Sequence, residues 1–242
     1  MKTAAALVIG NELLSGKIAD QNLVVLARTL RALGVELRRA VVVLDEIDII
    51  AAEVQALAAS HDWLFTSGGV GPTHDDLTIE GVARAFGVPV VSSPLLADLL
   101  LRHYGERLTE GHLLMARTPE GARLVDGQTL TWPAVVMRNV WILPGVPEIF
   151  QAKQALIRAE LAGGAPFVSL AVLTTLDEGQ LKPMLDRVVD SHRDVAIGSY
   201  PRWSDPEYRT RLTFDGLVEE RVRAARDAFA ASLPEGTLVR LE

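Results

Sequence analysis

The segment 66-TSGGVGPTHDDLT-78 combines three closely spaced glycines with two adjacent aspartates. The glycines let a ligand approach the backbone, whose N–H groups can bind a phosphate. The aspartates would repel that phosphate, but a divalent cation bound between carboxylate and phosphate cancels both charges. The segment therefore predicts an anion site beside a metal site. Its candidate phosphate-binding residues are Ser67, Gly68, Gly69, Gly71, Thr73 and Thr78, and its candidate catalytic and metal-binding residues are Asp75 and Asp76.

A simpler interpretation of the two aspartates stays open. Aspartate is a common helix N-cap, and a helix is predicted to begin at Leu77, so Asp75 or Asp76 is alternatively a cap. The segment is not a Walker loop, because no Lys-Ser/Thr pair follows its glycines, and it does not match G-x-G-x-x-G. His74 is interpreted as a solvated loop residue.

The segment 10-GNELLSGKIADQN-22 also follows a predicted strand. Its glutamate is a candidate partner for a metal or a hydroxyl group, and its serine and second glycine offer a hydroxyl and a backbone N–H. Asp20 and Asn22 are interpreted as helix caps and nothing more. The binding candidates in this segment are Gly10, Glu12, Ser15 and Gly16.

Two further segments follow predicted strands. In 43-VLDEID-48, Asp45 is a candidate catalytic and metal-binding residue, and Asp48 is interpreted as a helix N-cap. The segment 144-PGVPE-148 precedes a helix, so it either holds a second anionic group or is a turn. All four segments are expected at the same edge of one sheet, and this convergence favours a single site. The candidates in the last segment are Pro144, Gly145 and Pro147.

Strand and helix patterns alternate along the first part of the chain. Continuous apolar runs, typical of buried strands, are followed by stretches with apolar residues at helical spacing. This order predicts a parallel sheet covered by helices on both faces, with ligands bound beyond the carboxyl ends of the strands. The predicted strands are 4–9, 35–44 and 63–66, and the predicted helices are 20–33, 45–59 and 77–86.

Later segments complete this domain and add a second one. The segment 162-AGGAP-166 is the clearest linker. After it the pattern restarts in the order β-α-β-β-α-β, which is that of a ferredoxin-like, split βαβ unit. We therefore expect one domain over 1–162 and a small α+β domain over 163–242. The remaining predicted elements of the first domain are helical stretches at 95–107, 112–116 and 148–161 and a strand pair at 135–137 and 140–143.

The composition excludes several kinds of site and disfavours some partners. The chain has 242 residues and no cysteine, so disulfides, zinc–thiolate sites and cysteine nucleophiles are excluded. Its net charge of −7 disfavours nucleic-acid binding. No apolar run approaches the ~18 residues of a membrane span. We expect a cytoplasmic protein with neither a nucleic-acid nor a membrane partner.

On these motifs the chain resembles the MoaB/Mog molybdopterin-binding superfamily. More narrowly, it is similar to the CinA-like branch, which includes the N-terminal domain of eukaryotic FAD synthases. The family's glycine–aspartate loop is matched by 67–78 and its GxELL-G opening by 10–16. Its strand-end aspartate falls on Asp45, and its PGxP loop falls on 144–147.

The resemblance implies a three-layer α/β/α domain with a mainly parallel sheet, followed by the small α+β domain. It extends into the tail, where 177-DEGQLKPMLDR-187 and 198-GSYPRW-203 resemble the extension after this domain in FAD synthases. The family handles molybdopterin, including its adenylylation, or hydrolyses dinucleotide pyrophosphates such as ADP-ribose or FAD with a metal ion. Family members are commonly oligomeric, so we expect a homo-oligomer.

The chain departs from the family pattern at three places. Asn11 stands where an aspartate is common, which weakens the local negative charge. The segment 19-ADQN-22 replaces the usual Asn-Thr-Asn. No C-terminal FAD-synthase or amidohydrolase domain follows, so we expect those two activities to be missing.

Two functions remain as hypotheses. The first is a metal-dependent nucleotide pyrophosphatase that releases AMP and a second phosphate product. In it, Asp75 and Asp76 hold a divalent ion (Mg, Mn or Co), with Asp45 and Glu12 as further ligand or base candidates. The second is a protein that binds molybdopterin without turnover or takes part in its adenylylation. Motifs do not distinguish these ligands, because pterin, flavin and adenine rings are all flat.

Two features outside these motifs also have alternative interpretations. The aromatic–basic segment 199-SYPRW-203 either stacks a ring, contacts a partner subunit, or is a hairpin turn with a packed tryptophan. The apolar helix at 95–101 either packs at a subunit contact or is buried within its own domain.

Overall fold

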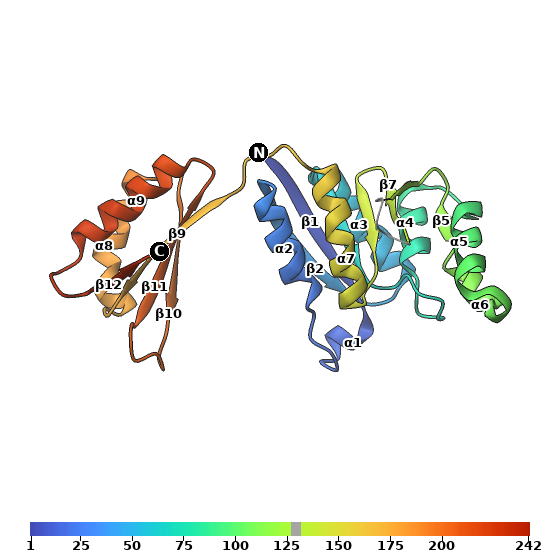
Figure 1. Ribbon diagram of the computed structural model, residues 1–242, viewed down its shortest axis with the longest axis horizontal. Helices are drawn as coiled ribbons and strands as arrows, with labels where there is room; N and C mark the ends of the chain where they lie inside the picture. The colour runs from blue at the N-terminus through green and yellow to red at the C-terminus, as the bar shows by residue number, and fades with distance from the viewer. Residues whose placement is uncertain (127–131) are drawn as a thin grey trace. The chain divides into compact units, whose positions relative to one another are not determined.

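The computed structural model describes residues 1–126 and 132–242 and divides the chain into two compact units (Figure 1). The first unit is Met1–Gly164 and the second is Ala165–Glu242. The division falls inside the glycine- and proline-containing segment 162–166. Each unit has its own sheet and its own buried core, which are the attributes of a domain.

A six-stranded sheet forms the centre of the first unit. Strands β2, β1, β3 and β8 run parallel, and β7 and β6 extend the sheet in antiparallel fashion. The predicted α/β class with a mainly parallel sheet is therefore confirmed. In order across the sheet, the strands are β2 (Val35–Val43), β1 (Lys2–Ile9), β3 (Trp63–Ser67), β8 (Val140–Leu143), β7 (Ala134–Met137) and β6 (Arg123–Val125).

Strand β1 shows why both faces of the sheet are covered. Its last six residues are all buried, as expected for a continuous apolar run in a central parallel strand. Ala5, Leu7 and Ile9 pack into one hydrophobic cluster, and Ala4 and Ala6 pack into another. Successive side chains of a strand point to opposite faces, so each face needs its own layer of helices.

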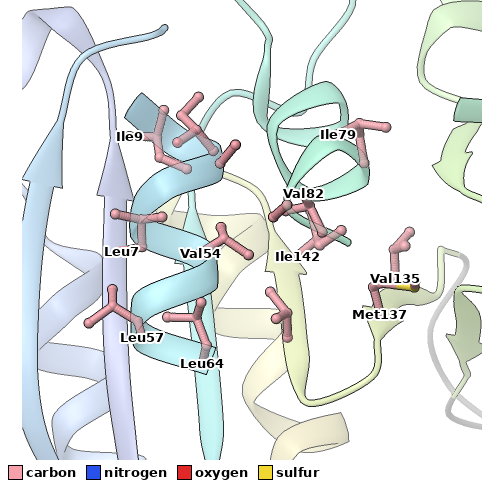
Figure 2. Close-up of a cluster of buried hydrophobic side chains, with 14 of the residues drawn as sticks. Leu7, Ile9, Val54, Leu57, Leu64, Ile79, Val82, Val135, Met137 and Ile142 are labelled. Atoms are coloured by element: carbon pink, nitrogen blue, oxygen red, sulfur yellow. The ribbon is translucent and has the colours of Figure 1, made fainter. Parts of the chain in front are cut away.

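Helices supply the two outer layers of the predicted α/β/α arrangement. Helices α3, α4 and α5 contribute to the cluster on one face, and α2 and α7 to the cluster on the other. Figure 2 shows the first cluster, where Leu7 of β1 lies with Val54 of α3 and Val82 of α4. These helices are α2 (Asn22–Ala32), α3 (Ile47–Ser60), α4 (Thr78–Phe86), α5 (Pro94–Tyr104) and α7 (Pro147–Glu160).

The first unit also contains several short helices and strands outside its central sheet. Strands β4 and β5 form a separate antiparallel pair, which sequence periodicity did not predict because each has only three residues. The short elements are α1 (Asn11–Leu14), β4 (Val90–Ser92), the 3₁₀ turn η1 (Gly105–Arg107), α6 (Glu110–Leu114) and β5 (Arg117–Pro119).

Helix α3 begins at Ile47, two residues after the predicted start at residue 45. Its first helical hydrogen bond runs from the N–H of Ile50 to the carbonyl of Glu46 (2.9 Å), so Glu46 occupies the N-cap position. The interpretation of Asp48 as the N-cap is therefore wrong. Asp48 lies in the first turn and forms an exposed ion pair with Arg84 of α4.

The start of α4 also differs from one of the expected interpretations. Its N-cap residue is Leu77, which has no side-chain cap. Capping by Asp75 or Asp76 is therefore wrong, because the carboxylate of Asp76 is used by the loop before the helix. At helix α2 the N-cap residue is Gln21, and the carboxylate before it bonds to the first turn, because Oδ2 of Asp20 accepts the N–H of Leu23 (2.9 Å).

Helix α5 is partly buried within its own unit. Leu96 and Leu100 are fully inside the core, whereas Leu95 and Leu101 are more than half exposed. Burial within the domain therefore accounts for one side of the apolar helix at 95–101. Arg102 and His103, which are exposed at the C-terminal end of α5, line the cleft of the first unit.

The second unit is a four-stranded antiparallel sheet with two helices. The strand order β10-β11-β9-β12 places β11 between β9 and β10, which is a split βαβ arrangement. Its core includes Leu181 of α8 and Phe214 of β11. The elements are β9 (Val168–Thr174), α8 (Glu178–Ser191), β10 (Ala196–Pro201), β11 (Thr210–Gly216), α9 (Glu219–Ser232) and β12 (Leu238–Leu241).

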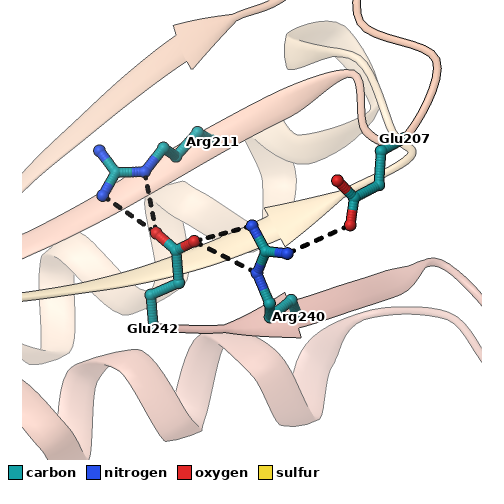
Figure 3. A network of polar contacts seen from close by, with 4 residues as sticks. All are labelled: Glu207, Arg211, Arg240 and Glu242. Carbon is teal, nitrogen blue, oxygen red and sulfur yellow. Dashed lines mark hydrogen bonds and ion pairs between the residues drawn. The ribbon is translucent and has the colours of Figure 1, made fainter.

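Surface charges link the strands of this second sheet. Figure 3 shows Glu242 between Arg211 (3.2 Å) and Arg240 (2.9 Å), with Arg240 also contacting Glu207 (3.2 Å). Exposed pairs of this kind contribute little one by one. On the same unit, Trp203 is 86% exposed, so the interpretation of 199–203 as a turn with a packed tryptophan is wrong.

Across residues 1–126 and 132–242, none of the helices combines the length and the apolar character that a bilayer crossing requires.

Candidate functional site

Four parallel strands end at one edge of the first sheet, and the four predicted segments follow them there. Backbone hydrogen bonds join the neighbouring ends, from Gly10 N to Val43 O (3.1 Å) and from Gly68 N to Leu143 O (3.2 Å). A cleft of about 1180 Å³ opens at this edge. Thirteen predicted residues line it, namely Gly10, Glu12, Asp45, Ser67, Gly68, Gly69, Gly71, Thr73, Asp75, Asp76, Pro144, Gly145 and Pro147.

Three predicted binding residues lie outside the lining of the cleft. Ser15 turns its hydroxyl back to the carbonyl of Glu12 (3.2 Å), and Gly16 follows with a left-handed φ of 72°. Thr78 is buried, and its hydroxyl donates to the carbonyl of Gly68 (2.7 Å). Ser15 and Thr78 form hydrogen bonds within the loops of the site, and none of these three residues lines the cleft.

Asp76 holds the glycine–aspartate loop in shape. Its Oδ1 accepts the N–H of Gly71 (2.6 Å), and its Oδ2 accepts both the N–H (2.7 Å) and the hydroxyl (2.5 Å) of Thr73. Hydrogen bonds to an ionised carboxylate are among the stronger ones in proteins. Asp76 is thus a positioning residue for the loop, and the Gly71 N–H is not free to bind a phosphate.

Close packing requires a glycine in each of two loops, Gly68 in the glycine–aspartate loop and Gly145 in the PGVP loop. Gly68 has a φ of 106°, and a Cβ there would lie 2.1 Å from the carbonyl oxygen of Ile9. Gly145 of the PGVP loop approaches the same residue, because a Cβ on Gly145 would lie 3.2 Å from the Cα of Gly68. The two glycine-containing loops therefore touch, and no side chain separates them.

Gly69 and Val70 present the backbone donors of this loop. Within the described residues, neither N–H has a hydrogen-bond partner. Both residues line the cleft. The N-terminus of α4 lies a few residues further along the loop, and its partial positive charge adds to the attraction for an anion. The arrangement is suited to one phosphate group.

Asp45 faces this loop from the end of β2. Its Oδ2 accepts the N–H of Asn11 (2.7 Å), so it is held in place although it is half-buried. Burial raises the pKa of Asp45, the Asn11 N–H opposes that rise, and the negative charges of Glu12 and Asp75 raise it further. A cation bound beside these carboxylates would favour the ionised form of Asp45 and so lower its pKa.

The carboxylates of the cleft have the chemistry that binds a hard divalent cation, but they are not yet arranged as a set of metal ligands. Glu12, Asp45 and Asp75 are oxygen donors that repel one another, and oxygen donors are what Mg²⁺ and Mn²⁺ prefer. In the part of the chain that the structure describes, no three acidic or histidine side chains already form a set of metal ligands. These carboxylates would have to draw together around an ion.

Asn22 joins three of the site segments, and the sequence did not identify this role. It is only 4% exposed, and its Nδ2 donates to Ser67 Oγ (2.9 Å) and to Gly145 O (2.8 Å). The interpretation of Asn22 as a helix cap is wrong. Its partners are 45 and 123 residues away along the chain, so no local pattern could reveal them.

Lys153 is a second cleft residue that the sequence did not identify. It is 3% exposed on α7, lines the cleft, and donates to the carbonyl of Trp132. Burial lowers the pKa of Lys153 to about 8, and the charge of Asp126 opposes this only in part. A signal did exist: Lys153 lies between Phe150 and Ile157 at helical spacing, so it interrupts the apolar side of the helix.

Comparisons with known proteins cover both units. A family model described as "Probable molybdopterin binding domain" matches residues 5–161, and one described as "FAD synthase, middle domain" matches 166–242. A "Probable FAD synthase" of Caenorhabditis briggsae is 33% identical over 254 residues, covering 94% of this chain and 49% of that protein. The chain therefore spans about half the length of this curated relative.

Two other relatives are similar over most of their own length. A protein of Saccharolobus islandicus is 40% identical over 214 residues, covering 82% of this chain and 80% of that one. The crystal structure of the protein CinA from Thermoplasma acidophilum, described as having unknown function, superposes with a TM-score of 0.61 at 31% identity. It covers 66% of this chain and 98% of the CinA chain.

Proposed function

The chain belongs to the family of probable molybdopterin-binding domains, in agreement with its resemblance to CinA-like proteins, and on that premise we propose that it hydrolyses the pyrophosphate of a dinucleotide. One observation carries the proposal: a single cleft joins the N–H groups of Gly69 and Val70, which have no hydrogen-bond partner among the described residues, to the carboxylates of Glu12, Asp45 and Asp75. N–H groups that can bind a phosphate, beside carboxylates that can bind a cation, are suited to a metal-dependent nucleotide pyrophosphatase.

In this proposal each loop has a separate task. The Gly69 and Val70 N–H groups bind one phosphate, and Asp76 keeps them in position. Asp45 and Asp75, with Glu12, hold a divalent ion that would neutralise phosphate charge and activate water. Hydrolysis adds a water oxygen to one phosphorus while the bridging P–O bond breaks, and AMP and a second phosphate product leave.

The size of the cleft favours a long ligand. Pockets for single small molecules usually measure about 300–1,000 Å³, and this one measures about 1180 Å³. Much of its remaining lining is apolar, including Leu99, Met115 and Trp132, which suits flat rings. FAD is the first dinucleotide to test, because two matches carry the name FAD synthase, and ADP-ribose is the second.

A second function is supported by a different observation. No three acidic or histidine side chains of the described residues form a ready metal site, and the family description names molybdopterin binding. The alternative is a protein that binds molybdopterin without turnover, or that serves its adenylylation, through the same loops.

The deciding experiment measures AMP release from FAD and ADP-ribose with Mg²⁺, Mn²⁺ or Co²⁺, and with a chelator instead. We expect metal-dependent release that falls about 100-fold or more in Asp45→Asn. Asp48→Asn is the matched control, because Asp48 lies three residues away and outside the cleft lining. Tight pterin binding without AMP release under any of these metals would favour the alternative, and full activity in Asp45→Asn would remove Asp45 from the site.

A further inference from the structure

Lys153 is a buried ammonium group in the wall of the cleft. Its Nζ donates to the carbonyl of Trp132, and only 3% of the residue is exposed. An ammonium group has three N–H donors, and the other two have no acceptor within the described residues. At pH 7 the group is mainly protonated, since its pKa is about 8.

No carboxylate forms an ion pair with Lys153 in the described part of the chain. Asp126 influences it only as a charge at longer range. A buried charge without a partner is unfavourable unless something bound supplies one. The unused N–H donors of Lys153 therefore indicate that a bound ligand supplies a hydrogen-bond acceptor there.

The position of Lys153 separates it from the phosphate-binding loop. Helix α7 begins at Pro147, directly after the PGVP loop that touches Gly68. Lys153 is six residues further along, which corresponds to about 9 Å of helix. A separation of this order divides the phosphate of a nucleotide-like ligand from its ring.

The neighbours of Lys153 in the cleft wall agree with a ring site. Trp132, whose carbonyl Lys153 contacts, lines the cleft together with Pro133, Val146 and Ile149, and Ile149 lies one helical turn before Lys153 on α7. Aromatic and apolar side chains bind the faces of flat rings. Apart from the indole N–H of Trp132, these four side chains offer a phosphate no hydrogen-bond donor.

We propose that Trp132 and Lys153 form the ring-binding end of the cleft, with Lys153 donating to a ring carbonyl oxygen. Flavins and pterins carry such oxygens on a flat ring, whereas adenine has none. The cleft is thus selective for oxo-bearing rings. This inference rests on the proposed function only in taking the ligand to lie along the cleft from the glycine loop to α7.

Two phosphate-free probes, riboflavin and adenosine, test this selectivity by equilibrium binding without metal ions. We expect the unaltered protein to bind riboflavin at least about tenfold more tightly than adenosine. Lys153→Met should weaken riboflavin binding about tenfold, the factor for one charge-assisted hydrogen bond, and change adenosine binding less than twofold. Lys182→Met, on the exposed face of α8, is the matched control and should change neither.

Several outcomes would overturn the proposal. Equal affinity of the unaltered protein for the two probes, or no binding of riboflavin, refutes it without any variant. An unchanged riboflavin affinity in a folded Lys153→Met protein does the same. A loss of inorganic phosphate or AMP binding in that variant, with riboflavin unaffected, would assign Lys153 to the phosphate. AMP release is measured separately, so failure of hydrolysis and failure of ring selectivity are distinguishable.

Discussion

At the scale of single residues, Asp45 and Lys153 share one property: the surroundings of each side chain disfavour its charged form. Burial raises the pKa of Asp45 and lowers that of Lys153. Such groups destabilise a fold and are concentrated at functional sites. Both line the same cleft, which is why we assign them to ligand binding and not to folding.

The pKa of Lys153 leads to a prediction about stability. Between pH 8 and 10.5 the unfolded chain holds a proton that the native protein has released, so the free energy of unfolding rises with pH in this window. Below pH 8 the full penalty is present, and the pKa difference corresponds to about 3 kcal/mol. Part of this gain is offset when the carbonyl of Trp132 loses its donor. We expect Lys153→Met to be about 1–2 kcal/mol more stable than the unaltered protein at pH 7.

Urea unfolding at pH 7 and pH 9.5 measures this difference. The advantage of Lys153→Met should shrink at pH 9.5, where the native lysine is neutral. Lys182→Met controls for the loss of a surface charge, since Lys182 is exposed and pairs only with Asp186 among the described residues. A variant that is less stable than the unaltered protein by the same amount at both pH values would contradict a buried, destabilising charge.

At the scale of elements, the loop between β3 and α4 depends on one of its two aspartates. Asp76 accepts three hydrogen bonds from Gly71 and Thr73, whereas Asp75 is exposed. We expect Asp76→Ala to lower the free energy of unfolding by about 2 kcal/mol and to weaken inorganic phosphate binding. Asp75→Ala should change stability by less than about 0.5 kcal/mol and reduce only metal-dependent AMP release.

Urea unfolding and calorimetric titration with phosphate separate the two aspartates. Asp75→Ala is itself the matched control for Asp76→Ala, because the residues are adjacent and chemically identical. Equal losses of stability in the two variants would mean that the Asp76 hydrogen bonds do not hold the loop.

The elements that carry the site could be predicted from the sequence because their signals are local. The apolar runs of β1 and β3 and the proline at the start of α7 identify the strands and the helix directly. Parallel order then places their carboxyl ends at one edge. The expected cap at Asp76 failed for a physical reason: its carboxylate accepts the N–H groups of Gly71 and Thr73 in its own loop.

The parts that could not be predicted depend on contacts between distant residues. Asn22 donates hydrogen bonds to Ser67 and Gly145, which lie too far away along the sequence for helical or strand periodicity to connect them with Asn22. Lys153 interrupts an apolar helix face, but the same pattern arises when a lysine extends past a core into water. Only its burial and the nearness of Trp132 distinguish the two cases.

At the scale of the whole molecule, the candidate site belongs to only one of the two units. Every residue that lines the cleft belongs to Met1–Gly164. That unit has hydrophobic clusters on both faces of its sheet, and the second unit has its own cluster around Phe214 and Phe229. Ligand binding and the fold of the first unit should therefore not require residues 165–242.

A protein ending at Gly164 tests this independence. We expect it to unfold cooperatively, because it keeps its own hydrophobic clusters. We expect it to bind riboflavin within about twofold of the full chain, because it keeps every residue that lines the cleft. Circular dichroism during heating and fluorescence titration measure the two properties. Lys153→Met should weaken riboflavin binding by the same factor in the shortened protein as in the full chain. This comparison controls for a change of binding mode. A folded fragment that binds riboflavin tenfold more weakly would show that the second unit contributes to the site, since the cleft walls all remain in the fragment.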